Sequence, residues 1–98
     1  MIISDIKSRE TMQTRTDGRY PLRIGSDVEF YFYPHLGSSM VLSYFMDKLG
    51  KPKSGHLVTS PVTNVEVYPD KYIITTENSI YYLERYNYEQ SCDQIHKT

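Results

Sequence analysis

The stretch from residue 59 to residue 84, TSPVTNVEVYPDKYIITTENSIYYLE, decides the fold. It contains three short runs rich in β-branched and aromatic residues, and two turn signals separate them. The first turn is Pro69-Asp70, since Pro presets φ and Asp can bond its own backbone. The second is Glu77-Asn78, because Asn tolerates a positive φ. The stretch predicts a three-stranded antiparallel meander, and its third run, apolar on both faces, is expected to lie centrally.

Upstream of this meander, residues 28–33 alternate between an apolar set (Val28, Phe30, Phe32) and a more polar set. Strict alternation predicts a strand with its apolar set facing the core. Residues 34–39 follow with Pro, Gly and Ser, which predict a loop. Residues 2–8 alternate only weakly, so they fit either an edge strand or the first turn of a helix.

The segment between residues 9 and 24 is polar and contains the turn dipeptide Asp17-Gly18. If Met12 and Thr14 face inward, residues 9–19 form a hairpin strand leading into this turn. Residues 19–24 would then be its partner. Pro21 cannot donate to a ladder, so that partner is expected to be an edge or irregular strand.

Residues 40–49 match two templates. Leu42, Phe45, Met46 and Leu49 follow helical spacing, which allows one short helix at 39–49. The same residues also alternate as a strand that ends in a hairpin loop, DKLGK, at residues 47–51. We favour the strand, because every neighbouring element is β and sequential strands usually pair.

Size and composition limit the classes of protein that fit. A chain of 98 residues forms a single domain, with a polar C-terminal tail at about residues 89–98. The single cysteine excludes an internal disulfide, and no run of about 18 apolar residues predicts a membrane helix. We therefore expect a cytoplasmic protein. A core this small leaves a thin stability margin, so a homodimer would be unsurprising.

The sequence offers no catalytic or metal-binding signature. His35, His56 and His96 lie far apart, without the close spacing of zinc ligands. No nucleophile elbow and no glycine-rich phosphate loop is present. We expect neither an enzyme nor a cofactor.

Tyrosine is the abundant feature, with ten residues and no tryptophan. Tyrosine packs well across strands, and it also supplies rigid contact area at protein interfaces. With basic residues on adjacent loops, the same rings could stack nucleobases. The net charge of −1 excludes strong bulk attraction to nucleic acid. The candidate binding residues are Tyr31, Tyr33, Tyr44, Tyr81, Tyr82, Arg15, Arg19, Arg23, Lys51 and Lys53.

The deciding stretch resembles the C-terminal part of small β accessory proteins of large tailed bacteriophages. The resemblance rests on the Thr-Ser-Pro-Val run at residues 59–62 and on Thr76, Asn78, Ser79, Tyr81 and Leu83, so it covers about a quarter of the chain. It implies a compact barrel-like fold and a role in which such proteins inhibit host defence or redirect host machinery by binding. It implies no site residues.

Together these patterns predict a mainly β protein, a small antiparallel barrel or half-open sheet similar to SH3-like folds. The leading hypothesis is a non-catalytic inhibitor or adaptor, phage-encoded, that binds a host defence protein through a tyrosine-rich sheet face. An RNA or single-stranded nucleic-acid binder is the alternative. A further alternative is an oligomer that sequesters a nucleotide between subunits. No membrane partner is expected.

Overall fold

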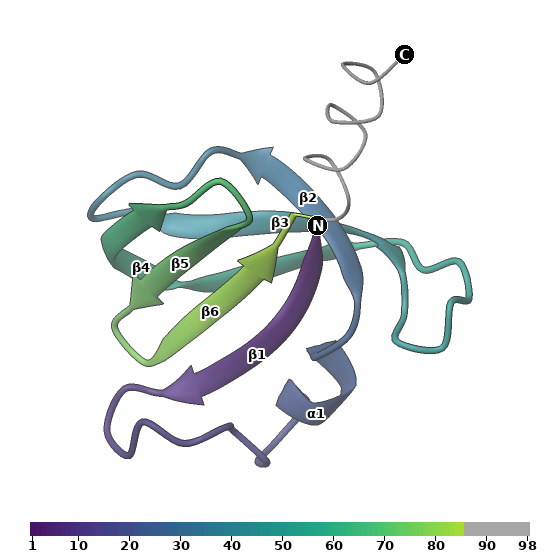
Figure 1. Ribbon diagram of the computed structural model, residues 1–98, viewed down its shortest axis with the longest axis horizontal. Coiled ribbons are helices and arrows are strands. Elements are labelled where there is room, and N and C mark those ends of the chain that lie inside the picture. The colour runs from purple at the N-terminus through teal and green to yellow at the C-terminus, as the bar shows by residue number, and fades with distance from the viewer. Residues whose placement is uncertain (86–98) are drawn as a thin grey trace, which may run out of the picture.

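The computed structural model describes residues 1–85, and these form six strands and one short helix. The strands pair in chain order, every pair is antiparallel, and the first strand closes on the last (Figure 1). The elements are β1 (Ile2–Ser8), α1 (Tyr20–Arg23), β2 (Asp27–Phe32), β3 (Ser39–Met46), β4 (His56–Val67), β5 (Lys71–Thr76) and β6 (Ser79–Glu84). The predicted mainly β fold is confirmed, as a closed barrel rather than a half-open sheet.

The meander predicted from residues 59–84 is present as β4, β5 and β6. Val65 pairs with Ile74, and Ile74 pairs in turn with Tyr81, so one row of side chains crosses three strands. Ile74 is fully buried and Tyr81 is 2% exposed, which places this row inside the barrel. β6 pairs with β5 on one side and with β1 on the other, so its central position is also confirmed.

Residues 39–46 form a strand, so the helix considered for residues 39–49 is wrong. β3 pairs with β2 along one edge and with β4 along the other. Met40 and Leu42 are fully buried, whereas Phe45 and Met46 are exposed. The helical stripe would have needed Phe45 and Met46 on the same buried face as Leu42, and two flanking strands favour the extended form instead.

β1 resolves the choice left open for residues 2–8, because it is a strand paired with β6 from Ile2 opposite Glu84 to Ser8 opposite Ser79. Its other edge meets β2 only at Ile2 opposite Asp27. Backbone bonds from Gly25 N–H to the Ile3 carbonyl at 2.7 Å, and back from Ile3 N–H to residue 26 at 3.0 Å, complete this short closure. Beyond it the two strands diverge.

The hairpin predicted for residues 9–24 is wrong. Residues 20–23 form α1, where Pro21 fits the first turn because that position needs no backbone donor. Residues 13–15 fold back on β1 instead, through Ser8 N–H to the Gln13 carbonyl (2.9 Å) and Arg15 N–H to residue 6 (2.8 Å). Met12, expected to face inward, is 57% exposed at a φ of 62°. Thr14, also expected inside, is exposed as well.

The core is a cluster of buried apolar side chains drawn from every strand, with Tyr20, Ile24, Phe30 and Tyr44 packed against it. Phe32 was expected to share the inward face of Val28 and Phe30, but it is 62% exposed. A register shift between Phe30 and Phe32 explains this, because a β-bulge turns the following side chains to the other face. The buried members are Ile3, Ile6, Val28, Met40, Leu42, Leu57, Val62, Ile74, Tyr81 and Leu83.

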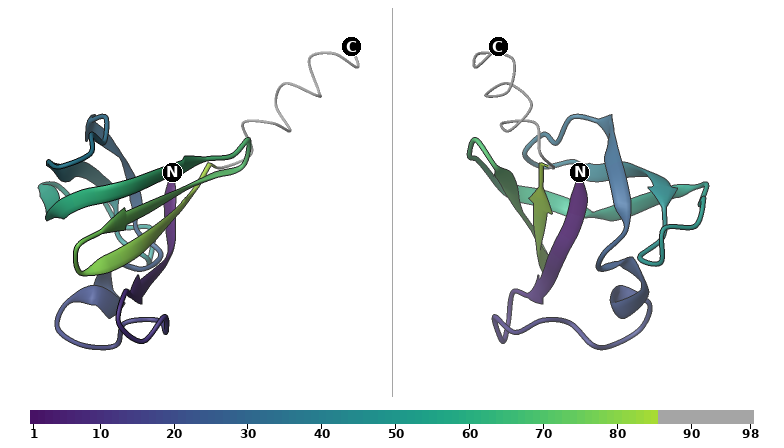
Figure 2. Two further views of the ribbon diagram at one scale, coloured as in Figure 1. Left: turned by 90° about the vertical axis from the view of Figure 1, so that its left-hand side faces the viewer. Right: turned by 45° about the vertical axis from the view of Figure 1, so that its right-hand side comes forward.

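The connection between β3 and β4 projects from the barrel, and we call residues 47–55 the arm (Figures 1 and 2). Asp47 Oδ1 accepts bonds from the backbone N–H of Leu49 (2.9 Å) and Lys51 (3.0 Å), which confirms the hairpin loop predicted there. At its base the arm touches the turn after α1. A Cβ on Gly25 would lie 2.8 Å from the Lys48 Cβ, so only glycine permits this approach.

Candidate binding surfaces

The outer surface of β2, β3 and β4 carries an apolar row whose two ends are exposed and whose middle residue, Val41, is half-buried. Phe32 pairs with Val41, and Val41 pairs with Val58, so the row is three strands wide. Phe32 is 62% exposed and Val58 is 63% exposed. Large apolar side chains at this exposure, side by side, are typical of a surface that another molecule covers.

Two aromatic side chains extend this row. The ring of Tyr31 meets that of Phe32 edge to face at 4.7 Å between centroids, and meets His56 at 4.6 Å. The register shift in β2 places Tyr31 and Phe32 on adjacent parts of the surface. We call the surface formed by Tyr31, Phe32, Val41, His56 and Val58 the aromatic face.

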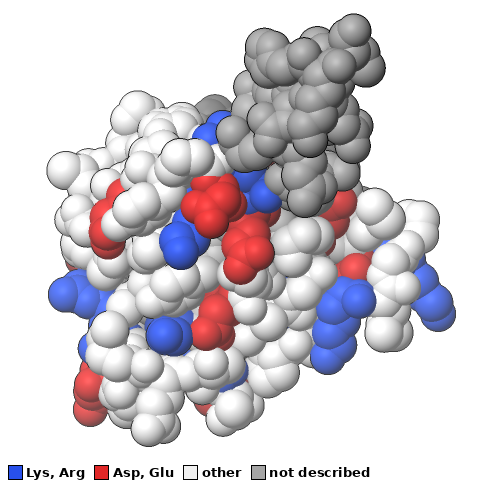
Figure 3. All heavy atoms as spheres, viewed as in Figure 1, with Lys and Arg blue, Asp and Glu red and all other residues white. Residues whose placement is uncertain are grey.

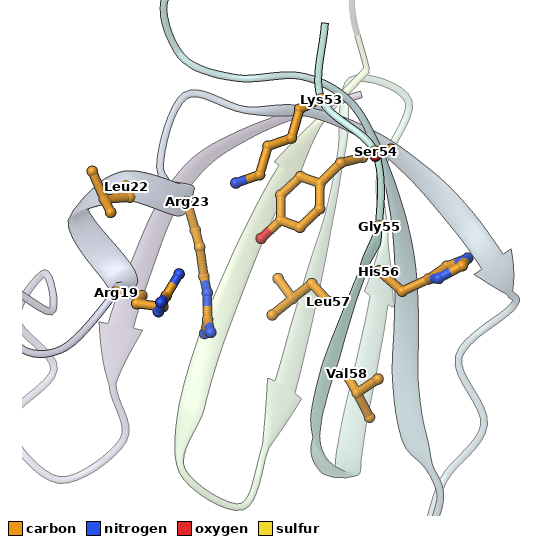
Figure 4. Close-up of a pocket in the computed structure, with 10 residues that line it drawn as sticks. Arg19, Leu22, Arg23, Lys53, Ser54, Gly55, His56, Leu57 and Val58 are labelled. Carbon is orange, nitrogen blue, oxygen red and sulfur yellow. The ribbon is translucent and has the colours of Figure 1, made fainter.

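A second concave surface lies between α1 and the start of β4. It is a cavity of about 300 Å³ that includes Arg19, Arg23 and Lys53, and we call it the basic pocket. In Figure 4 these three side chains extend into the space between the helix and the strand. Leu57 points into the same space, whereas His56 points away from it. The full lining is Arg19, Leu22, Arg23, Tyr44, Lys53, Ser54, Gly55, His56, Leu57 and Val58.

Aromatic rings hold two of these cations in place. The Lys53 ammonium lies 4.0 Å from the centre of the Tyr44 ring, and the Arg23 guanidinium lies 5.1 Å from that of Tyr20. Arg15 approaches the same Tyr20 ring at 4.1 Å. Each contact is a cation–π interaction, which restrains a flexible basic side chain without neutralising its charge.

The lining of the basic pocket contains no carboxylate. Within residues 1–85, neither Arg19, Arg23 nor Lys53 forms an ion pair. Arg15 differs, because its guanidinium binds both carboxylate oxygens of Asp17, at 3.1 and 2.8 Å. That hydrogen bonding holds the pKa of the Asp17 carboxyl below its usual value.

Two tyrosines, Tyr44 in the lining of the pocket and Tyr81 in the core, have raised pKa values. Burial raises the pKa of Tyr44, and the neighbouring Arg23 only partly opposes this effect. Burial likewise raises the pKa of Tyr81, with Tyr20 adding to the rise while Arg23 and Arg15 act against it. Both phenols are therefore neutral at physiological pH, and the Tyr44 hydroxyl at the pocket can donate a hydrogen bond.

The ten candidate residues do not form one surface. Tyr31 belongs to the aromatic face, and Tyr33 lies in a neighbouring group with Phe30 and Tyr72, at 5.4 and 6.4 Å. Tyr81 is a core residue, so it is not available to a partner.

The other candidates divide between the pocket and separate places on the barrel. Tyr44, Arg19, Arg23 and Lys53 meet in the basic pocket. Tyr82 is half-buried on β6, with the Lys7 ammonium 5.0 Å from its ring. Arg15 is tied to β6 by Ser79, and Lys51 is exposed on the arm.

Sequence reasoning missed Phe32, Val58 and Leu22 as surface residues. Phe32 sits in an alternation that predicted burial, and only the bulge reverses it. The exposed position of Val58 follows from strand alternation once its neighbours Leu57 and Thr59 are known to be buried, because successive side chains of a strand point to opposite faces. Leu22 becomes part of the pocket through α1, which was not predicted.

Charge on the face shown in Figure 3 is mixed. Acidic and basic side chains lie interspersed among uncharged ones, and basic side chains lie at the side from which the arm projects. Residues 1–85 contain no cluster of three or more residues with metal-binding side chains. His96 and the tail at residues 89–98 lie outside the described residues. In the part of the chain that the structure describes, no helix has the length and apolar character needed to cross a bilayer.

Comparison with known proteins yields no match: no family model, no curated protein and no solved structure is similar to this chain. The structure itself assigns the class of the protein, a small six-stranded antiparallel barrel. The aromatic face and the basic pocket are its two candidate binding surfaces.

Proposed function

We propose that this barrel is a non-catalytic binding protein that docks on a partner protein through its aromatic face. The observation that carries the proposal is the row of Phe32, Val41 and Val58 across three adjacent strands, in which Phe32 and Val58 are exposed on either side of the half-buried Val41. A partner that buries this row would gain free energy, because removing apolar surface from water is worth roughly 25 cal/mol per Å². Tyr31 and His56 add aromatic groups with polar atoms at the margin.

A protein partner suits this face better than a nucleic acid. Its centre is aliphatic and aromatic, with valines from two strands, and no lysine or arginine belongs to it. Glu29 is exposed in the neighbouring row, opposite Ser43, which pairs with His56. A carboxylate at this position repels phosphate, while buried apolar contacts with a polar rim are typical of protein interfaces.

The resemblance of residues 59–84 to phage accessory proteins extends the proposal to the kind of partner. It favours a phage-encoded inhibitor or adaptor acting on a host protein in the cytoplasm. A second copy of the chain is the competing occupant of the face. Residues 1–85 contain no cluster of metal-binding side chains, but that absence is not an argument for binding. The test therefore addresses the face directly.

The test is affinity capture of the tagged protein from the producing cells, with nuclease treatment. Phe32→Glu places a charge within the face at a residue that does not line the basic pocket, and Val67→Glu is the control, since Val67 is an apolar residue at 55% exposure on β4 beyond the face. We expect Phe32→Glu to lose a stoichiometric partner at least tenfold and Val67→Glu to retain it, because an unpaired charge in an apolar interface costs more than about 1.4 kcal/mol.

Three outcomes would overturn the proposal. Retention of every partner by Phe32→Glu would remove the face from the interaction. Recovery of RNA alone, lost on nuclease treatment, would indicate a nucleic-acid binder. A concentration-dependent dimer abolished by Phe32→Glu, measured by light scattering, would assign the face to self-association.

A further inference from the structure

The basic pocket differs in chemistry from the aromatic face, although His56 and Val58 border both. It gathers cations from two segments that are distant in the sequence, residues 19–23 at α1 and the end of the arm, around a cavity of about 300 Å³. Arg19 is exposed, while Arg23 and Lys53 are half-buried. The chain after α1 and the arm approach each other closely at Gly25 and Lys48.

The charges of this pocket are unbalanced. Three like charges converge on one concavity, and no carboxylate lines it or pairs with them within residues 1–85. A protein can relieve such repulsion by spreading the side chains into solvent. Here the contact with Tyr44 fixes Lys53, and the contact with Tyr20 fixes Arg23, so both cations stay near the cavity. A pocket of this kind is complementary to an anion.

The hydrogen-bonding groups narrow the class of anion. Arginine and lysine side chains are donors only, and the neutral Tyr44 hydroxyl can donate as well. A ligand must therefore bring several acceptors and more than one negative charge. A phosphate group satisfies both requirements, and guanidinium groups match its geometry with paired hydrogen bonds.

An apolar recess continues from the basic pocket. A second cavity of about 250 Å³ shares Leu22 and Lys53 with it and is bordered by Leu49. Leu22 is 56% exposed and Leu49 is 74% exposed, so both offer apolar surface to a ligand. Asp47 borders this recess together with Lys48 and Lys53, so its charges are mixed and a phosphate is favoured less there than in the basic pocket. The recess instead suits the sugar and base of the same molecule.

We propose that the pocket binds a nucleotide, with its phosphate between Arg19, Arg23 and Lys53 and its base against Leu22 and Leu49. Each cavity is close to the lower limit for small-ligand sites, and the joined pair is of a suitable size. A free nucleotide fits better than a nucleic-acid strand, because on the face that Figure 3 shows the basic side chains do not form one continuous patch and acidic side chains lie among them.

Calorimetric titration of the full chain at low salt tests this proposal. The probes are a nucleoside diphosphate, inorganic phosphate, the unphosphorylated nucleoside and a short oligoribonucleotide. We expect the diphosphate to bind more tightly than inorganic phosphate, and the nucleoside not to bind. Affinity for the diphosphate should fall with added salt, since ion pairs at a half-open site are screened.

Variants localise the site. Lys53→Gln and Arg19→Gln are expected to weaken diphosphate binding about tenfold each, the loss of one charge-assisted contact. Lys71→Gln is the matched control, because Lys71 also lies over a tyrosine ring, Tyr68 at 5.7 Å, but far from the pocket on β5. Phe32→Glu, on the aromatic face, should leave diphosphate affinity unchanged, which keeps this test independent of the proposed protein interface.

Three results would overturn the proposal. No heat from any phosphate at millimolar concentration would show that the pocket is not a phosphate site. Equal weakening by Lys71→Gln and Lys53→Gln would show diffuse attraction to a charged surface. Binding of the oligoribonucleotide without the diphosphate would assign the pocket to a nucleic-acid strand.

Discussion

The meander of β4 to β6 and the segment from residue 9 to residue 26 reach the same barrel by different means. In the meander, complete ladders and alternating side chains define each position, with Ile74 at the centre of a row buried from both sides. None of the named strands lies within residues 9–26. Individual backbone hydrogen bonds attach this segment to the barrel instead. The difference teaches that a closed barrel needs only part of its circumference to be regular.

Individual contacts attach the irregular segment to the strands around it. Arg15 donates to Ser79 Oγ at 2.8 Å and to the Asn78 carbonyl at 3.3 Å, while its backbone N–H binds residue 6. One residue therefore connects the segment to β1 through its backbone and to β6 through its side chain. We expect amide hydrogens in residues 9–26 to exchange faster than those of β5, since few ladder bonds protect them.

The largest effect in this comparison is expected at the centre of the meander. Ile74→Ala should lower the free energy of unfolding by about 2–5 kcal/mol, because Ile74 is fully buried and its removal leaves a cavity. Urea unfolding measures the change. Ile73→Ala is the control, since Ile73 is only half-buried on the opposite side of the same strand, and it should cost clearly less. Equal losses would show that the inner row is no more important than the outer one.

A smaller effect is expected in the irregular segment, at Gly25. Its φ of +95° and the 2.8 Å approach to Lys48 both oppose a side chain. Gly25→Ala should destabilise the fold by about 1–3 kcal/mol through backbone strain and the close contact. Gly18→Ala is the control, because Gly18 has a φ of +54° but no neighbour within 4 Å. If both variants lost the same stability in urea, the contact with the arm would contribute nothing.

The smallest effect concerns Tyr81, a core residue of the meander whose pKa is also affected by Tyr20, Arg23 and Arg15 of the irregular segment. Burial raises its pKa above the ordinary value of 10.0. Above pH 10 the unfolded chain therefore loses this proton before the folded chain does, and stability falls by up to about 1.4 kcal/mol per pH unit. Urea midpoints at pH 9 and pH 11 measure the decline, and Tyr81→Phe should reduce it. An unchanged decline in Tyr81→Phe would assign it to other groups.

The sequence was sufficient where local pattern and final environment agree. The meander, the strand at β3 and the mainly β class follow from alternation and turn residues, because paired strands bury one face in a regular way. α1 could not be predicted from its four residues, since so short a helix has no apolar periodicity to read. Pro21 was taken as a sign of an edge strand, although it also suits a first helical turn.

The candidate surfaces were predicted only in part. Arg19, Arg23, Lys53 and Tyr44 were named as candidates from the sequence, but that they meet in one pocket depends on where α1 packs, which no local pattern encodes. Phe32 shows the same limit for the aromatic face, because a single bulge reverses its side. Composition identified the abundant tyrosines but could not separate Tyr81 in the core from Tyr31 on the surface.

The pairing of β1 with β6 has a consequence for how the chain folds. Ile2 pairs with Glu84, so β1, the first of the six strands in chain order, finds its main partner only after the other strands have been made. Until then β1 is held by one residue pair with β2 and by backbone bonds to residues 13–15 and 25–26. Closing so long a loop makes contact order high and folding slow. The nascent chain therefore carries β1 with one edge open until β6 emerges, and the barrel closes after synthesis of that strand rather than during it.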